Sequence, residues 1–122
     1  MSRSVLVVED DALNLRFFTE LLSWQGYRVR AARTGAGALA AAQDERPDLV
    51  LLDIELPDES GLSVAGALRA DAALSDVPVV AVTANARAGE EARLREGGCS
   101  AYVSKPVNMR GFLDVVRKFA QN

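Results

Sequence analysis

The apolar residues of the chain fall into short, nearly uniform runs that alternate with longer stretches of helical periodicity. Four runs predict strands buried on both faces, as in a parallel sheet covered by helices. They are residues 5–8, 49–52, 77–82 and 101–103. A fifth segment, residues 27–31, alternates between apolar and polar positions and predicts a strand nearer the edge of the sheet.

Each predicted strand is followed by a stretch that favours a helix. Residues 12–24 carry apolar side chains on one face, and Gly26 is expected to end this helix. Thr34 and Ser60 are the expected N-terminal caps of the second and third helices. Residues 86–96 are charged and weakly amphipathic, so the fourth helix should be marginal. In the last helix, residues 108–120, the residues at core spacing are Met109, Phe112, Leu113, Val116 and Phe119.

Five strands that alternate with five helices predict a single α/β domain over residues 1–122, with a parallel sheet and right-handed crossovers. The chain has 122 residues, 49% of them hydrophobic, which is enough for a substantial core. Its net charge of −3 and the lack of a basic stripe argue against direct binding to DNA. No apolar run approaches the ~20 residues of a membrane-spanning helix. The four residues before the first strand leave no room for a signal peptide.

The reactive side chains narrow the chemistry further. The sequence contains no histidine, which excludes histidine metal sites and Ser-His or Cys-His triads. Its single cysteine, Cys99, excludes an internal disulfide and fits a reducing cytoplasm. We interpret Cys99 as a small buried hydrophobic residue, and not as a redox thiol.

Polar residues stand where the predicted strands end. Glu9 and Asp10 follow the first strand, Asp53 the third, Thr83 the fourth and Lys105 the fifth. The carboxyl ends of parallel strands form one rim of the sheet, where ligands bind in such folds. These side chains are therefore expected to converge on one pocket.

Three carboxylates that converge would repel one another unless cations neutralise them. Lys105 supplies one positive charge, and oxygen-only ligands suit Mg²⁺ as a second. Asp53 beside Mg²⁺ and Lys105 could attack phosphorus, with the Thr83 hydroxyl as a donor to the new phosphoryl group. The alternative is a purely structural acid cluster that Lys105 satisfies.

The residues that suggest this chemistry resemble those of a response-regulator receiver domain. They are Glu9-Asp10, residues 53–57 (DIELP), Gly61, Thr83-Ala84 and residues 102–106 (YVSKP). The resemblance covers essentially the whole chain. It implies a flavodoxin-like (βα)5 three-layer sandwich with strand order 2-1-3-4-5, and a receiver that no output domain follows.

The resemblance also implies a role for each residue of the rim. Asp53 would be the phosphoacceptor, and Asp10, Asp53 and the main-chain carbonyl of Glu55 would bind Mg²⁺ directly. Glu9 would act through water. The side chain of Glu55 would stand beside the phosphorylation site. With Asn85, it would flank the path of the water that hydrolyses the phosphoryl group.

A second group of implied residues would read the phosphoryl group and respond to it. Thr83 and Lys105 would bind its oxygens, and the Lys105–Pro106 peptide bond would be cis. Tyr102 would be a switch that turns inward as Thr83 moves, although it could also be an ordinary strand aromatic. The surface formed by the fourth helix, fifth strand and fifth helix would then change.

Four further segments resemble the DivK-type regulators of alphaproteobacterial cell division and polar development. They are residues 9–14 (EDDALN), 25–27 (QGY), 78–84 (PVVAVTA) and 96–99 (EGGC). This likeness implies control by histidine kinases and phosphatases, or by a phosphotransfer protein, and output through downstream regulatory proteins. It also implies a cytoplasmic protein that its kinases could recruit to a cell pole, as a monomer or a weak phosphorylation-dependent dimer.

Two other classes of protein share part of this pattern. Asp53-Ile54-Glu55 suggests a haloacid-dehalogenase-type phosphatase, but that family uses a second aspartate, a cap and a longer chain. A flavodoxin-like electron carrier would need a phosphate-binding loop after the first strand, where Glu9-Asp10-Asp11 would repel phosphate.

The first helix carries more apolar surface than packing on one sheet requires. Beyond its core stripe it has Leu13, Phe17, Leu21 and Trp24, which neighbouring helices could also cover. Alternatively, a docking face for the phosphodonor would lie close above the acid cluster. Its residues would be Asn14, Phe17, Pro106 and Met109.

Overall fold

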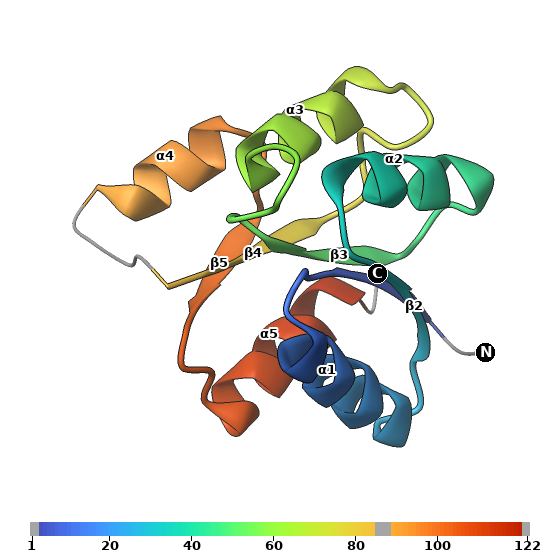
Figure 1. Ribbon diagram of the computed structural model, residues 1–122, viewed down its shortest axis with the longest axis vertical. Coiled ribbons are helices and arrows are strands. Elements are labelled where there is room, and N and C mark those ends of the chain that lie inside the picture. Colours follow the sequence, from blue (N-terminus) through green and yellow to red (C-terminus); the bar gives the residue numbers. More distant parts are fainter. Residues whose placement is uncertain (1–2, 85–88, 121–122) are drawn as a thin grey trace.

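The computed structural model describes residues 3–84 and 89–120, which form a five-stranded parallel sheet in the order β2-β1-β3-β4-β5 (Figure 1). The order is the one implied by the resemblance. The three central strands are buried along their whole length because helices cover both faces. The strands are β1 (Ser4–Val8), β2 (Arg28–Ala32), β3 (Leu49–Asp53), β4 (Val79–Thr83) and β5 (Ala101–Ser104).

The helices form two layers, one on each face of the sheet (Figure 1). α1 (Ala12–Trp24) and α5 (Met109–Ala120) cover one face. α2 (Gly35–Asp44), α3 (Gly61–Ala70) and α4 (Glu90–Glu96) cover the other. Helices on both sides of a parallel sheet complete a three-layer α/β sandwich.

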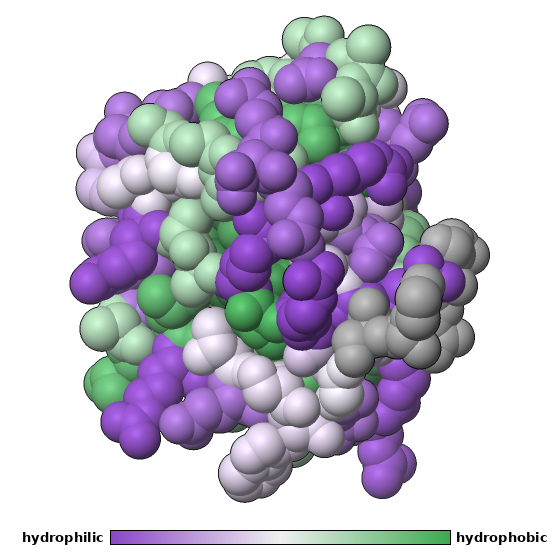
Figure 2. Space-filling model, turned by 90° about the vertical axis from the view of Figure 1, so that its right-hand side faces the viewer, coloured by the Kyte–Doolittle hydropathy of each residue, from purple (hydrophilic) through white to green (hydrophobic). Residues whose placement is uncertain are grey.

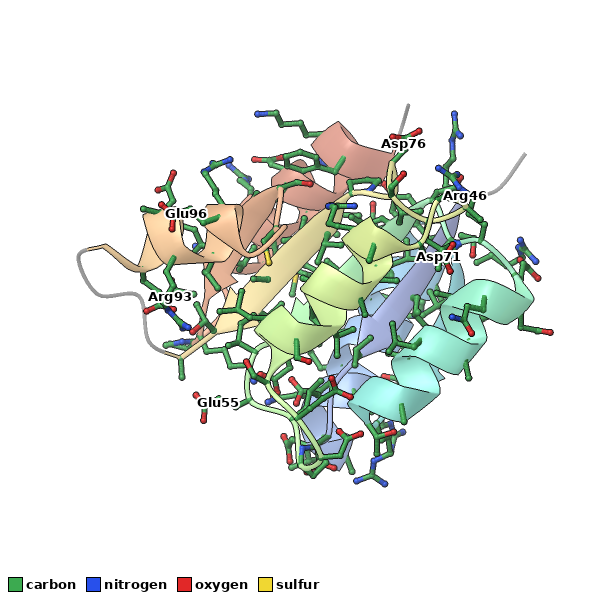
Figure 3. The ribbon with its side chains drawn as sticks, turned by 90° about the horizontal axis from the view of Figure 1, so that it is seen from above. Arg46, Glu55, Asp71, Asp76, Arg93 and Glu96 are labelled. Carbon is green, nitrogen blue, oxygen red and sulfur yellow. The ribbon has the colours of Figure 1, made fainter. Side chains whose placement is uncertain are left out.

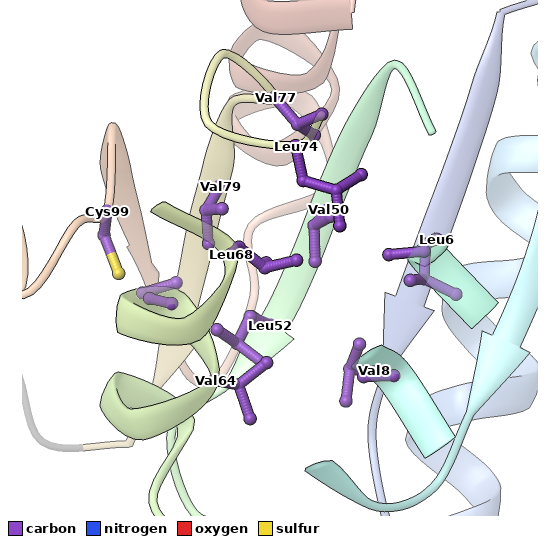
Figure 4. Packing of buried hydrophobic residues seen from close by; sticks show 14 of the residues in the cluster. Leu6, Val8, Val50, Leu52, Val64, Leu68, Leu74, Val77, Val79 and Cys99 are labelled. Carbon is purple, nitrogen blue, oxygen red and sulfur yellow. The ribbon is translucent and has the colours of Figure 1, made fainter. Parts of the chain in front are cut away.

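The two faces bury separate hydrophobic cores. Under α1 and α5 the core contains Phe18 and Phe112 together with aliphatic residues of the strands. Under α2, α3 and α4 it is aliphatic, as the packing of Leu68 against Val50 and Leu52 illustrates (Figure 4). Cys99 belongs to this second core, and burial raises the pKa of its thiol to about 11. The interpretation of Cys99 as a small buried hydrophobic residue is thus confirmed.

Local sequence features set the helix ends as predicted. The Thr34 side chain accepts the Gly37 N–H at 3.0 Å, and the Ser60 side chain accepts the Leu62 N–H at 3.2 Å. Gly26 follows α1 with φ of +92°, a left-handed conformation that glycine adopts without strain. These contacts satisfy N–H groups that a helix cannot bond internally.

The outer surface differs in places from the sequence-based expectation. Met109 is 52% exposed at the first turn of α5, so its assignment to the core is wrong. In contrast, Leu21 is covered, whereas Leu13 and Trp24 remain 78% and 84% exposed. Residues 86–88, at the start of the predicted fourth helix, lie outside the described residues.

Hydrophilic and apolar residues are interspersed on the side of the molecule shown in Figure 2. Every helix in residues 3–84 and 89–120 is too short or too polar to cross a bilayer.

Candidate functional site

The register of the sheet brings the predicted site residues to one rim. Val8 pairs with Leu52, and Asp53 pairs with Val82, so β1, β3 and β4 end at nearly the same level. Glu9 therefore emerges beside Asp53, with Thr83 at the end of the next strand. The Lys105 N–H donates to the Thr83 carbonyl at 2.8 Å, which holds the segment after β5 against β4.

Lys105 lies between the two buried carboxylates of the rim. Its Nζ is 3.1 Å from Glu9 Oε1 and 3.4 Å from Asp53 Oδ2. Glu9 is only 2% exposed and Asp53 6%. The other oxygen of each carboxylate accepts a main-chain N–H, Glu9 Oε2 from Asp11 at 3.1 Å and Asp53 Oδ1 from Glu55 at 3.0 Å. Each carboxylate is therefore held by one cation and one peptide group.

The charges of this cluster do not balance, because one ammonium group faces two carboxylates. Burial raises the pKa of Glu9, and hydrogen bonding with Asp53 raises it further. The Asp11 N–H and Lys105 lower this pKa, but by less. Burial alone would lower the pKa of Lys105, but its hydrogen bonds with Glu9 and Asp53 and their charges raise it. Lys105 thus remains a cation, and the cluster favours an additional positive charge.

The cluster lines one wall of a pocket of about 220 Å³ at the rim. The lining residues are Glu9, Asp10, Asp11, Asp53, Glu55, Ala84 and Lys105. Asp10 is exposed, whereas Thr83, the last residue of β4, is buried with 2% exposure.

These residues fit a hard divalent cation with a mixed set of ligands. Within residues 3–84 and 89–120, no three His, Cys, Asp or Glu side chains are arranged to hold a metal ion by themselves. A metal bound here would use carboxylates together with main-chain carbonyl and water oxygens, a set that Mg²⁺ accepts. Asp10, Asp53 and the Glu55 carbonyl are the candidates on this rim.

Tyr102 lies on β5, and the Lys105–Pro106 peptide bond follows that strand. Tyr102 is partly buried and packs against the aliphatic core. The peptide bond between Lys105 and Pro106 is cis, as the resemblance implied. Asn85, the second residue expected to flank the path of water, lies outside the described residues.

A second, less polar pocket adjoins the rim between α1 and the segment after β5. It measures about 210 Å³ and contains Asn14, Phe17 and Pro106, three of the four predicted docking residues. Phe18, Lys105 and Val107 complete its lining. Met109 instead lines a separate depression on α5 with Arg110 and Leu113. The structure therefore groups three of the four residues and separates Met109 from them.

One residue near the site has no counterpart in the sequence analysis. The Asp58 carboxylate, five residues after Asp53, accepts the N–H groups of Gly35 and Ala36 at 2.8 and 3.1 Å. Asp after Pro is an ordinary turn signal. Nothing in the local sequence links it to a helix that begins 23 positions earlier.

Comparison with known proteins identifies the class of protein that this fold and rim define. A model of the response regulator receiver domain matches residues 5–117. The chain therefore belongs to the response regulator receiver domain family.

Curated relatives and solved structures agree with this assignment. The chain is 44% identical over 119 residues to the polar-differentiation response regulator DivK of Brucella anthropi, with 98% of this chain and 97% of the relative covered. Its fold matches the chemotaxis protein CheY4 of Vibrio cholerae (TM-score 0.92, 24% identity, 98% and 99% of the two chains). It also matches the receiver domain of a sensor histidine kinase from Pseudomonas aeruginosa (TM-score 0.91, 29% identity, 100% of both). The latter structure has a magnesium ion coordinated in its active site cleft.

Proposed function

We propose that the chain is a single-domain response regulator that accepts a phosphoryl group on Asp53 from a phosphohistidine donor. The observation that carries this proposal is the position of Lys105, within 3.4 Å of two buried carboxylates, Glu9 after β1 and Asp53 at the end of β3. An ammonium group so placed can balance charge on a phosphoryl group attached to Asp53.

In the transfer, an Asp53 carboxylate oxygen forms a bond to phosphorus while the bond from phosphorus to the donor imidazole nitrogen breaks. The nitrogen keeps the electron pair. The Glu55 N–H orients the Asp53 carboxylate, and the Lys105 ammonium group would stabilise the negative charge on the equatorial oxygens of the phosphoryl group. Asp10, Asp53 and the Glu55 carbonyl would hold Mg²⁺, with Glu9 acting through water, and the metal would neutralise further negative charge.

The phosphorylated form would signal through a change of surface. A phosphoryl group on Asp53 would attract the Thr83 hydroxyl, and Tyr102 would turn inward as Thr83 moves. Thr83 lies on β4 and Tyr102 on the neighbouring strand β5, where Thr83 pairs with the last residue, Ser104. The surface of α4, β5 and α5 would therefore differ between the two forms.

The likeness to DivK supports a role in cell-cycle or cell-division signalling. In this proposal histidine kinases and phosphatases, or a phosphotransfer protein, set the phosphorylation level, and downstream regulatory proteins read it. The protein would act in the cytoplasm as a monomer or weak phosphorylation-dependent dimer, and its kinases could recruit it to a cell pole. The receiver match over residues 5–117 favours this signalling module over a phosphatase or an electron carrier.

The donor would dock on the pocket between α1 and the segment after β5. Phe17 is 40% exposed and shares this pocket with Asn14, Pro106 and Lys105. Apolar contact around the lysine would place the donor imidazole next to Asp53.

The test of the central proposal is incubation with acetyl phosphate and MgCl₂, followed by intact-mass spectrometry. We expect wild-type protein to gain one phosphoryl group and Asp53→Asn to gain none. Omission of the magnesium should prevent the gain. Equal labelling of wild type and Asp53→Asn would show that another residue accepts the group, and no labelling of either would end the proposal.

A further inference from the structure

The loop that connects β3 to α3 is closed tightly at its base. The Gly61 N–H donates to the Ile54 carbonyl at 2.8 Å, and Glu55 and Ser60 form an isolated bridge. A Cβ atom at Gly61 would lie 2.5 Å from the Asp53 carbonyl oxygen, so only glycine permits this approach. The loop therefore begins and ends directly against the phosphoacceptor strand.

The tip of the same loop is attached to α2. Asp58 Oδ1 accepts the Gly35 N–H at 2.8 Å, and Oδ2 accepts the Ala36 N–H at 3.1 Å. The next N–H along the helix, that of Gly37, is accepted by Thr34. The first three N–H groups of α2 thus find side-chain acceptors, two of them on a segment 23 residues away.

The attachment is specific in shape as well as in charge. A Cβ atom at Gly35 would lie 2.6 Å from Cγ of Glu59, so the loop packs directly against the start of α2. The N–H groups of Gly35 and Ala36 hold the pKa of Asp58 below its ordinary value. Asp58 is therefore ionised at neutral pH, next to the positive end of the α2 dipole.

Glu55 lies on this loop, three residues before Asp58, and its N–H orients Asp53 Oδ1. Figure 3 shows Glu55 at the edge of the molecule below α3, where it is exposed. Glu55 belongs to the closed base through its bridge with Ser60. The bonds from Asp58 to α2 add a long-range contact that holds the remainder of the loop in place.

We propose that Asp58 is a positioning residue for the phosphorylation site, which fixes the Glu55 main chain by fastening the β3–α3 loop to the start of α2. This inference rests on the proposed function, because the Glu55 carbonyl is there a ligand of Mg²⁺. Loss of the hydrogen bonds from Asp58 to α2 should weaken binding of the metal, although none of the proposed metal ligands is replaced.

The test compares Asp58→Ala with Thr34→Ala by titration with MgCl₂ alone, followed by calorimetry or by the shifts of amide resonances. Both variants remove a side-chain acceptor from the first turn of α2, but only Asp58 belongs to the loop. We expect Asp58→Ala to raise the dissociation constant of Mg²⁺ about tenfold, as loss of an outer-shell partner does. Thr34→Ala should leave this constant unchanged, and Asp58→Asn, which keeps one acceptor, should restore part of the affinity.

A second measurement does not depend on the metal. Hydrogen exchange at the amides of Glu55 and Gly61 should become about fivefold faster in Asp58→Ala, the effect expected for a lost helix cap, but not in Thr34→Ala. Unchanged affinity and exchange in Asp58→Ala would overturn the inference, and so would equal changes in the two variants. If wild-type protein bound no Mg²⁺, the proposed function would fail, while faster exchange in Asp58→Ala alone would still support the fastening.

Discussion

The two faces of the sheet are built differently. Under α1 and α5 the core includes two aromatic rings, those of Phe18 and Phe112, whose centroids are 5.1 Å apart, and the helices are 13 and 12 residues long. Under α2, α3 and α4 the buried core consists of Leu, Val, Ala and Ile side chains together with Cys99, and the described helices have 10, 10 and 7 residues. Phe17 adds an edge contact to Phe18 at 5.5 Å on the first face.

This difference suggests that the helices on the two faces differ in local stability. Aromatic side chains bury more area than aliphatic ones, so α1 and α5 are firmly attached. The buried residues of the short helix α4, as described, are Leu94 and Glu90. With so little buried surface, the local stability of α4 should be low. On this basis α1, on the aromatic face, is suited to present a fixed docking surface, and α4, on the aliphatic face, is suited to move. The following predictions test that comparison.

The largest effect is expected from truncating the aromatic core. Phe112 and Leu94 are both 1% exposed, one on each face of the sheet. Phe112→Ala should lower the free energy of unfolding by about 4 kcal/mol, since a buried phenyl ring leaves a large cavity. Leu94→Ala should lower it by about 2 kcal/mol, because the short α4 can collapse around the gap. Urea denaturation measures both.

The comparison fails if Leu94→Ala costs as much stability as Phe112→Ala. In both variants the slope of the unfolding free energy against urea concentration should equal that of the wild type. A different slope would indicate a changed denatured or native state.

A smaller effect is expected at the base of the β3–α3 loop. In Gly61→Ala the new methyl carbon would meet the Asp53 carbonyl oxygen at 2.5 Å and the Ile54 Cα at 2.7 Å. Both neighbours are backbone atoms, so the strand or α3 must shift, at a cost of about 1–3 kcal/mol. Phosphorylation by acetyl phosphate should slow as well, because the shift moves Asp53.

Gly66 provides the matched control within the same helix. A Cβ atom there would meet nothing within 4 Å. Gly66→Ala should therefore stabilise the protein by about 0.5–1 kcal/mol and leave phosphorylation unchanged. Destabilisation by both substitutions would show that α3 tolerates no change at all, and that the close approach at Gly61 is not the cause.

The sequence predicts the strands and the rim well because both follow from strong local patterns. Residues 49–52 are uniformly apolar, and the structure has β3 over Leu49–Asp53. A buried strand has little freedom of register, so its last residue reaches the rim next to the last residues of its neighbours. For this reason the convergence of Glu9, Asp53 and Lys105 could be derived from their positions along the chain.

Features that depend on packing between distant segments could not be predicted in this way. The bonds from Asp58 to α2 join residues that no pattern connects, and they exist only once both elements lie on the same face. Met109 continues the apolar spacing of α5, yet it stands at the first turn, and its side chain remains exposed. Periodicity locates the face of a helix, but not how far along that face the sheet extends.

The smallest effect on stability, with a distinct effect on kinetics, is expected at the docking pocket. Phe17 is 40% exposed between Asn14 and Pro106, so Phe17→Ala removes surface from the aromatic face without opening the core. Phosphotransfer from the cognate histidine kinase should slow about tenfold, the loss typical of an interface anchor worth about 1.4 kcal/mol. Loading by acetyl phosphate should be unchanged, because that donor is too small to need the pocket.

Trp24→Ala is the control for Phe17→Ala, since Trp24 is 84% exposed at the last turn of the same helix, away from the rim. It should alter neither reaction. Equal slowing of both donors in Phe17→Ala would mean that the ring supports the chemistry of the site and not the docking. Slowing of kinase transfer by Trp24→Ala to the same degree would extend the docking surface along the whole of α1, and the aromatic face would then be a broad platform instead of a single pocket.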